Sequence, residues 1–171
     1  PYHPHFTHTV FRGWYDFGTG ALGDMACHGM DAAYWILDLG YPTRIVPEAT
    51  QRFGETAPKM TRVEYDFPAK GSRPAVKVVW RDGDLRPPQP VGLPITMEWP
   101  PSDIGGQMWV GDDGALIAGM YGEDPVLLDP KRDAEVRANP PLKVYPRSKG
   151  VYDEWIEAIK GGPPALSAFD G

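Results

Sequence analysis

The chain is expected to fold as an α+β protein with a mainly antiparallel, open sheet and its helices on one face of that sheet. Two observations predict this class. A long helical pattern lies near the start of the chain and a shorter one near its end, and the residues between them show the alternation and β-branched enrichment of strands. Elements segregated in this way favour antiparallel pairing. A sheet face that its own chain leaves uncovered predicts a partner subunit, so we expect a homo-oligomer formed through the open face.

Composition narrows the class of protein. The 171 residues are 42% hydrophobic and 23% charged, which is typical of a globular protein with a core. The formal net charge of -6 argues against nucleic acid or an anionic membrane as the partner, since both require a basic surface. No apolar run approaches the roughly 20 residues of a membrane helix, and no signal-like segment opens the chain, so we expect a cytoplasmic location. The single cysteine, Cys27, excludes an internal disulfide.

Proline and glycine positions predict the first elements. Residues 1–13 combine prolines with histidines and aromatic residues, and we expect an extended arm there, followed by a single domain over 14–171. A helix is predicted over 21–39, with Thr19 as a candidate N-cap and Gly40 as the residue that follows its end. One face of this helix is apolar and comprises Leu22, Ala26, Met30, Ala33 and Leu37.

Strands are predicted in the middle of the chain, where β-branched and aromatic residues are enriched, at 44–51, 61–67 and 75–81. The Asp-Asp-Gly sequence at 112–114 predicts a hairpin between short strands at 108–111 and 115–119. A turn, a proline-rich loop and an irregular stretch are expected, in that order, at 82–84, 85–101 and 125–146.

A second helix is predicted over 151–160, because two glycines follow an amphipathic pattern there. Its residues Trp155, Ile156 and Ile159 are expected to face inward. Trp35 of the first helix is likewise expected in the core, since large aromatic side chains bury much apolar area.

Asp24, His28 and Asp31 are the candidate functional residues in the first predicted helix. They are four and three residues apart, a spacing that places side chains on one helical face. A histidine between two carboxylates can act in proton transfer, because a carboxylate neighbour can fix the tautomer of an imidazole. The same spacing also suits a solvated helix surface, so the spacing alone leaves both interpretations open.

The segment from Trp14 to Asp31 reads Trp-Tyr-Asp-Phe-Gly-Thr-Gly-Ala-Leu-Gly-Asp-Met-Ala-Cys-His-Gly-Met-Asp. It resembles the second domain of the Gfo/Idh/MocA oxidoreductases. More narrowly, it looks like a bacterial subgroup that carries Arg-Gly-Trp-Trp-Asp-Phe-Gly-Thr-Gly-Ala-Leu-Gly-Asp-Met-Ala-Cys-His. Further segments similar to that subgroup begin at Leu39, Phe67, Val110 and Tyr121, so the resemblance spans most of the chain.

The resemblance implies an NAD(P)-dependent enzyme that acts on a sugar, an inositol or a related polyol. In that family a Rossmann domain binds the cofactor and a second α/β domain covers the nicotinamide. Asp24 and His28 match the family residues that contact substrate hydroxyls, with His28 assisting proton removal while hydride passes to the cofactor. The chain has no Gly-x-Gly-x-x-Gly after a strand and no Glu-Lys-Pro, so we expect a truncated or minimal domain without cofactor-binding residues.

Other candidates have weaker patterns. Trp14 and Tyr15 are candidates to stack on a sugar ring, and packing in the core or at an interface is the alternative. Asp31 is a candidate substrate-binding residue that is expected to support His28, and a place on the helix surface is the alternative. No metal site is expected, because the arm with three histidines contains no carboxylate or cysteine. Cys27 and His28 are not expected to form a nucleophile pair, since adjacent helical residues diverge by about 100°.

Two functions of different classes follow. The first is the substrate-binding and oligomerisation domain of an NAD(P)-dependent sugar or polyol oxidoreductase, with His28 as general acid or base and Asp24 fixing the substrate. The second is a cofactor-free domain, either a carbohydrate-binding module or a small hydrolase or lyase that uses the Asp24–His28 pair. A structural dimer unit without activity is a third possibility. Because the hydride chemistry belongs to the nicotinamide, the residues of this chain do not decide whether it is an enzyme.

Overall fold

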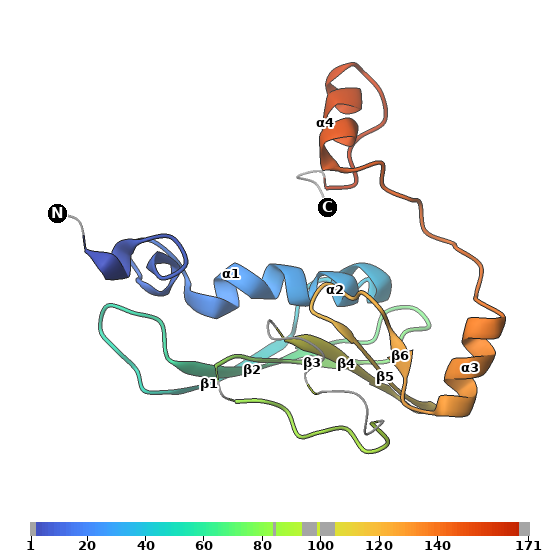
Figure 1. Ribbon diagram of the computed structural model, residues 1–171, viewed down its shortest axis with the longest axis horizontal. Helices are drawn as coiled ribbons and strands as arrows, with labels where there is room; N and C mark the ends of the chain where they lie inside the picture. Colours follow the sequence, from blue (N-terminus) through green and yellow to red (C-terminus); the bar gives the residue numbers. More distant parts are fainter. Residues whose placement is uncertain (1–2, 84, 94–98, 100–104, 168–171) are drawn as a thin grey trace. The chain divides into compact units, whose positions relative to one another are not determined.

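The computed structural model of the chain describes residues 3–83, 85–93, 99 and 105–167 (Figure 1). Within these ranges it contains four α-helices and two three-stranded antiparallel sheets, which confirms the α+β class. None of the helices described is long and apolar enough to cross a membrane. The chain divides into two compact units, Pro1–Asp133 and Ala134–Gly171, and each is considered separately below. This division falls at another place than the predicted boundary between an arm at 1–13 and a domain at 14–171. The predicted boundary after residue 13 stays a prediction.

The first sheet has three strands in the order β1-β2-β3. Their bounds are β1 Arg44–Thr50, β2 Met60–Phe67 and β3 Val76–Arg81. The structure therefore confirms, to within one residue at each end, the strands predicted at 44–51, 61–67 and 75–81. The register places Val63 of β2 between Pro47 of β1 and Trp80 of β3.

One face of this sheet forms the core of the first unit. Val63, Phe67 and Trp80 are buried on that face, and Phe67 is only 1% exposed. The ring of Tyr34 meets the ring of Phe67 edge-on, with centroids 5.4 Å apart. Burial raises the pKa of the phenols of Tyr34 and Tyr65 above the ordinary value of 10.0. The two helices of this unit that follow the N-terminal arm lie along one side of the strands, as expected (Figure 1).

The other face of the first sheet carries a ladder of ion pairs, as the two-residue alternation of a strand requires. Glu64 on the central strand accepts hydrogen bonds from Arg62 and from Lys77, the latter at 3.3 Å. These bonds lower the pKa of the Glu64 carboxyl, the bond from Arg62 contributing most, and hydrogen bonding to Glu64 raises the pKa of Arg62. The ladder is extended by the pairs Arg62–Glu48, Arg44–Asp66 and Lys77–Asp66.

The single helix predicted over 21–39 is wrong, because the structure has two helices there. These are α1 Gly20–Gly29 and α2 Asp31–Leu37. The break lies at Met30, where φ is -103° and ψ is -12°. Beside the break, Gly29 packs closely, since a Cβ on Gly29 would lie 2.8 Å from Sδ of Met120 and 3.3 Å from the Trp80 ring.

The ends of these helices also differ from the expectation. Thr19 precedes α1, but its side chain makes no capping hydrogen bond with any residue that the structure describes. Asp38, in the left-handed conformation with φ of 47°, ends α2 in place of Gly40. An aspartate tolerates this conformation better than most residues. Its carboxylate forms an exposed ion pair with Lys70 at 2.6 Å.

The second sheet has the order β4-β5-β6. Its strands are β4 Gly106–Gly111, β5 Gly114–Gly119 and β6 Val126–Leu127. The predicted hairpin is confirmed, but Gly114 pairs with Gly111, so the loop has two residues where the sequence predicted three. The buried amide of Gln107 is satisfied, since its nitrogen donates to the Met120 carbonyl at 2.9 Å and its oxygen accepts from Trp109 Nε1 at 3.0 Å.

The structure contains two sheets where one open sheet was expected. The residues between β3 and β4 include the proline-rich stretch predicted as a loop over 85–101. Residues 85–93 contain no helix or strand, which agrees with that prediction, whereas much of the remainder lies outside the described ranges. Among the residues described, β3 pairs only with β2 and β4 pairs only with β5.

The N-terminal arm is not extended as predicted. It forms two short 3-10 helices, Pro4–Phe6 and Phe11–Gly13. His3 starts the first one, because its Nδ1 accepts from the His5 amide at 3.2 Å. The Phe6 ring packs edge-on against Trp14 with centroids 5.1 Å apart, so aromatic contacts favour a folded arm.

Residues 125–146 are not irregular throughout, as was expected. Helix α3, Pro130–Ala138, spans the boundary between the two units. The missed signal is Asp129 before a proline, since the Asp129 carboxylate accepts from the amides of Lys131 and Arg132.

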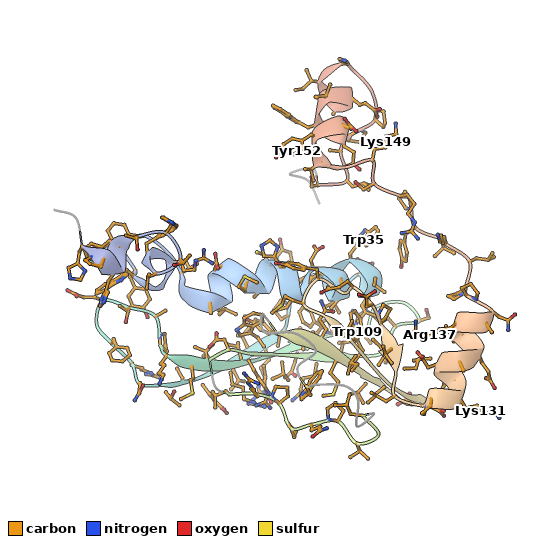
Figure 2. The ribbon with its side chains drawn as sticks, in the orientation of Figure 1. Trp35, Trp109, Lys131, Arg137, Lys149 and Tyr152 are labelled. Atoms are coloured by element: carbon orange, nitrogen blue, oxygen red, sulfur yellow. The ribbon has the colours of Figure 1, made fainter. Side chains whose placement is uncertain are left out.

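The last helix is confirmed, with α4 spanning Val151–Ile159 and Gly161 following at a φ of 84°. Its predicted inward face is wrong, because Trp155 is 62% exposed and Ile156 and Ile159 are also exposed. The same holds for Trp35 of α2, which is 54% exposed and lies on the side of its helix away from the strands (Figure 2). Helical periodicity predicts an apolar face, but it does not specify what packs on it.

Candidate functional site

His28 lies on the exposed side of α1. Its imidazole ring stands 5.6 Å from the ring of Tyr121, measured between centroids, with an interplanar angle of 73°. Tyr121 follows β5 in a turn, and its backbone amide donates to the Glu123 carboxylate at 2.8 Å. The site therefore places a solvent-accessible imidazole beside a phenol from a distant part of the sequence.

Asp24 lies one turn before His28 on the same helix and forms an ion pair with Arg12. The distance from Arg12 Nη1 to Asp24 Oδ2 is 2.5 Å. The two side chains are 43% and 31% exposed, so both remain accessible to a ligand. The Nε atom of Arg12 is buried and has no hydrogen-bond partner within the described part of the chain. Arg12 thus orients the carboxylate and keeps one unused N–H donor nearby.

The three candidate residues do not form a chain of hydrogen bonds. Within the ranges that the structure describes, no hydrogen bond or ion pair joins His28 to Asp24 or to Asp31. The break at Met30 makes Asp31 the first residue of α2. A carboxylate in the first turn of a helix is stabilised by the helix dipole, which is a structural role.

Trp14 and Tyr15 precede α1 and differ in their surroundings. Trp14 Nε1 donates to the His5 carbonyl at 3.1 Å, and its ring packs on Phe6, so this side chain holds the arm. The Tyr15 amide donates to the Glu55 carbonyl at 2.9 Å, while its ring is exposed. The exposed Tyr15 ring is therefore free to meet a ligand without losing a packing role.

The match to a family model bears directly on these residues. Residues 1–79 match the Gfo/Idh/MocA model described as "Oxidoreductase family, C-terminal alpha/beta domain". The match is consistent with a Gfo/Idh/MocA C-terminal domain over these residues. The matched part contains α1, α2 and the first sheet up to β3, and with them Arg12, Asp24 and His28. No curated protein matches the chain.

The described residues of the chain do not fit a nicotinamide dinucleotide. Such cofactors bind where a parallel strand leads through a glycine-rich turn into a helix. Every strand pair that the structure describes is antiparallel. We therefore assign no hydride-transfer step to these residues.

The described residues also contain no group of three or more histidine, cysteine, aspartate or glutamate side chains that could hold a metal ion. The rings of His3 and His5 lie 5.0 Å apart in the arm. Cys27 is exposed, and its thiol faces the Asp24 carbonyl at 3.5 Å, with no ion pair to His28 among the residues described.

Two residues of the candidate site were not selected from the sequence. Arg12 belongs to the Arg-Gly-Trp part of the motif that resembles the Gfo/Idh/MocA subgroup, so the signal was present. Tyr121 begins another similar segment, but its approach to His28 depends on how the turn after β5 packs against α1, which spacing does not predict.

Proposed function

We propose that the chain is the substrate-binding part of an NAD(P)-dependent oxidoreductase that acts on a sugar or polyol, with His28 as the general acid or base. The observation that carries this proposal is the pairing of Asp24 with Arg12 one helical turn from an exposed His28, all within the matched residues. A carboxylate held in place by a guanidinium is a suitable acceptor for a hydroxyl group.

The reaction of a secondary alcohol requires removal of the hydroxyl proton, and the neutral imidazole of His28 would accept it. The Asp24 carboxylate would accept a hydrogen bond from a neighbouring hydroxyl, while Arg12 keeps that carboxylate oriented. Tyr121 and Tyr15 add phenols suited to a ligand rich in hydroxyl groups. The nicotinamide that takes the hydride would be held outside the described residues, so this chain contributes binding and proton transfer.

The proposal includes a homo-oligomer formed through the outward face of the first sheet. Arg62, Glu64 and Lys77 on that face are paired with one another across the strands. A second copy would meet charges of both signs, which suits a polar and specific interface.

Binding of unmodified polyols tests the proposal. We expect myo-inositol or glucitol, added to the full chain, to shift the imidazole resonances of His28 in an NMR titration. Asp24→Asn should weaken this binding by about tenfold or more, since a hydrogen bond to a charged group is lost. Glu55→Gln, an exposed change outside the site, is the matched control. Absence of binding by any polyol tested would reject the assignment of this substrate class.

A further inference from the structure

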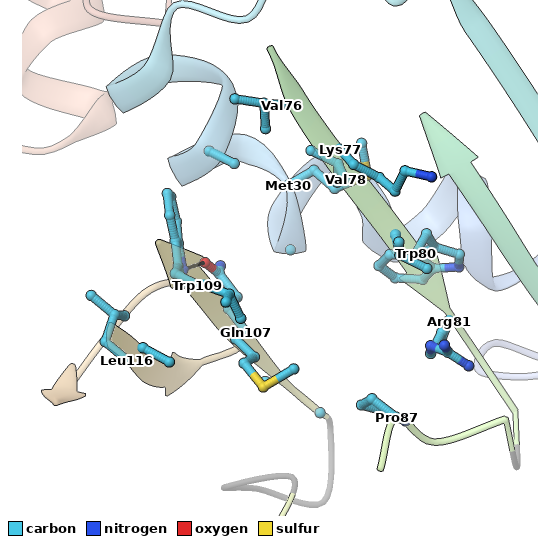
Figure 3. Close-up of a pocket in the computed structure, with 18 of the residues that line it drawn as sticks. Met30, Val76, Lys77, Val78, Trp80, Arg81, Pro87, Gln107, Trp109 and Leu116 are labelled. Atoms are coloured by element: carbon cyan, nitrogen blue, oxygen red, sulfur yellow. Dashed lines mark hydrogen bonds between the residues drawn. The ribbon is translucent and has the colours of Figure 1, made fainter. Parts of the chain in front are cut away.

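Two unpaired strand edges line one cavity in the first unit. The cavity has a volume of about 1190 Å³, and every residue of Val76–Arg81 on β3 and Gly106–Gly111 on β4 contributes to its wall (Figure 3). Neither strand has a second partner among the residues described. An unpaired strand edge presents a row of backbone donors and acceptors that another strand can use.

Apolar side chains of the two N-terminal helices line the same cavity. Met25 of α1, Met30 at the break, and Ala33 and Leu37 of α2 all contribute. Met30, Ala33 and Leu37 belong to the apolar helix face predicted from the sequence, whereas Met25 was not predicted on that face. The volume of the cavity exceeds the roughly 300–1,000 Å³ of small-molecule pockets, which favours a polypeptide as the occupant.

Charge is distributed unevenly along the cavity. Figure 3 shows Val76 and Trp109 toward one end and Arg81 toward the other. Arg81 and Arg86 line the cavity, and neither has an acidic partner among the described residues. The neighbouring Asp82 carboxylate already accepts hydrogen bonds from the Thr61 amide, the Thr61 hydroxyl and Trp80 Nε1.

The opposite end of the cavity carries charges of both signs. Asp112 and Asp113 form the loop of the β4–β5 hairpin and line the cavity, but Arg132 also lines it and its guanidinium donates to the Asp113 carbonyl. A ligand with an acidic group at the Arg81 end is therefore complementary in charge.

We propose that this cavity binds an extended β-strand of another polypeptide, which pairs with the free edges of β3 and β4 and places its apolar side chains beneath α1 and α2. Backbone hydrogen bonds would supply affinity, and alternate side chains would supply specificity. An acidic residue at one end of the strand would meet Arg81 and Arg86. The site is separate from His28, which lies on the exposed side of α1, so the two proposals fail independently.

Two capped peptides test the proposal on the full chain, Glu-Val-Thr-Val-Thr-Val-Lys and Lys-Val-Thr-Val-Thr-Val-Glu. They have the same composition and opposite charge order. Whichever direction the inserted strand takes, one of the two peptides therefore places its glutamate at the Arg81 end. We expect at least one to bind in calorimetry and to slow hydrogen exchange at the amides of both β3 and β4. Binding of neither peptide at about 1 mM, or protection outside these strands, would overturn the proposal.

Modified peptides separate strand pairing from simple apolar binding. Successive amides of an inserted strand point to opposite edges, so N-methylation of either alternate set should abolish binding. Equal binding of the methylated and parent peptides would overturn strand pairing.

Substitutions test the charged end. Arg81→Glu should weaken peptide binding by about tenfold, whereas Arg81→Lys should retain it. Arg52→Glu, in an exposed loop outside the cavity, is the matched control. His28→Asn should leave peptide affinity unchanged, which distinguishes this site from the proposed polyol site.

Discussion

Asp24 is paired with Arg12, twelve residues earlier in the chain, and not with His28, one helical turn later. This ion pair connects the N-terminal arm to α1 and orients the carboxylate in the candidate site. The helix alone would place Asp24 near His28, so the folded arm decides which partner the carboxylate takes.

The Arg12–Asp24 pair should show a measurable but small coupling. A double-mutant cycle with Arg12→Ala and Asp24→Asn is expected to give about 0.3 to 1 kcal/mol, because both side chains are partly exposed and solvent screens their attraction. The free energy of unfolding in urea measures it. Purely additive effects would mean that the pair contributes nothing to folding.

Replacing His28 should affect chemistry and leave stability intact. In an assembly that supplies the cofactor-binding half, His28→Asn is expected to lower turnover by about 10²- to 10⁴-fold, since the proton acceptor is lost. The free energy of unfolding should change by less than about 0.5 kcal/mol, because the residue is exposed. Cys27→Ala is the control on the same helix. Turnover equal to that of the unmodified protein would remove His28 from the mechanism.

The core face of the first sheet should be sensitive to Phe67. Phe67→Ala is expected to cost about 3 to 5 kcal/mol, because the side chain is fully buried and packs against Tyr34. Phe67→Leu should cost less and keep the protein folded for comparison. Val91→Ala, at a side chain 98% exposed, should change stability little. Similar losses at Phe67 and Val91 would contradict the assignment of the core.

Acid should weaken the ion-pair ladder through Glu64. The pKa of this carboxyl lies below its ordinary value of 4.5, first because Arg62 hydrogen-bonds to it and then because Lys77 does. A carboxyl whose pKa is lowered by folding stabilises the protein above its unfolded pKa, and this contribution is lost as the pH falls through the folded pKa.

The stability difference between the unmodified protein and Glu64→Gln should therefore be full at about pH 7 and should be lost as the pH falls below 4.5 and through the lowered pKa of the folded state. Urea unfolding at several pH values measures this difference, with Glu55→Gln as an exposed control. A difference that stays constant from neutral to acid pH would show that the charge of Glu64 does not stabilise the sheet.

Local sequence patterns predicted most of the helices and strands but few of the contacts between them. The strands of the first sheet, the β4–β5 hairpin and α4 follow from alternation, turn residues and terminal glycines, which act over a few residues. The break at Met30 does not, because no glycine, proline or capping residue at position 30 marks it in the sequence. Helix α3 was missed although Asp129 and Pro130 carry a local start signal.

The candidate site was likewise predicted only in part. Asp24 and His28 were predicted from spacing and from the motif, both of which are local in sequence. The ion pair with Arg12 and the contact with Tyr121 depend on the folded arm and on the turn after β5. Trp35 and Trp155 were expected in the core because aromatic residues favour burial, but each is more than half exposed in its unit.

The ion-pair ladder on the outward face of the first sheet has a consequence for assembly. Glu64 and Asp66 on the central strand stand between the cations Arg44 and Lys77 of the flanking strands. Dissolved ions screen exposed charges within about 10 Å at 0.1 M salt. Subunits joined through this face should therefore separate as ionic strength rises, whereas subunits joined through an apolar face would hold together more firmly.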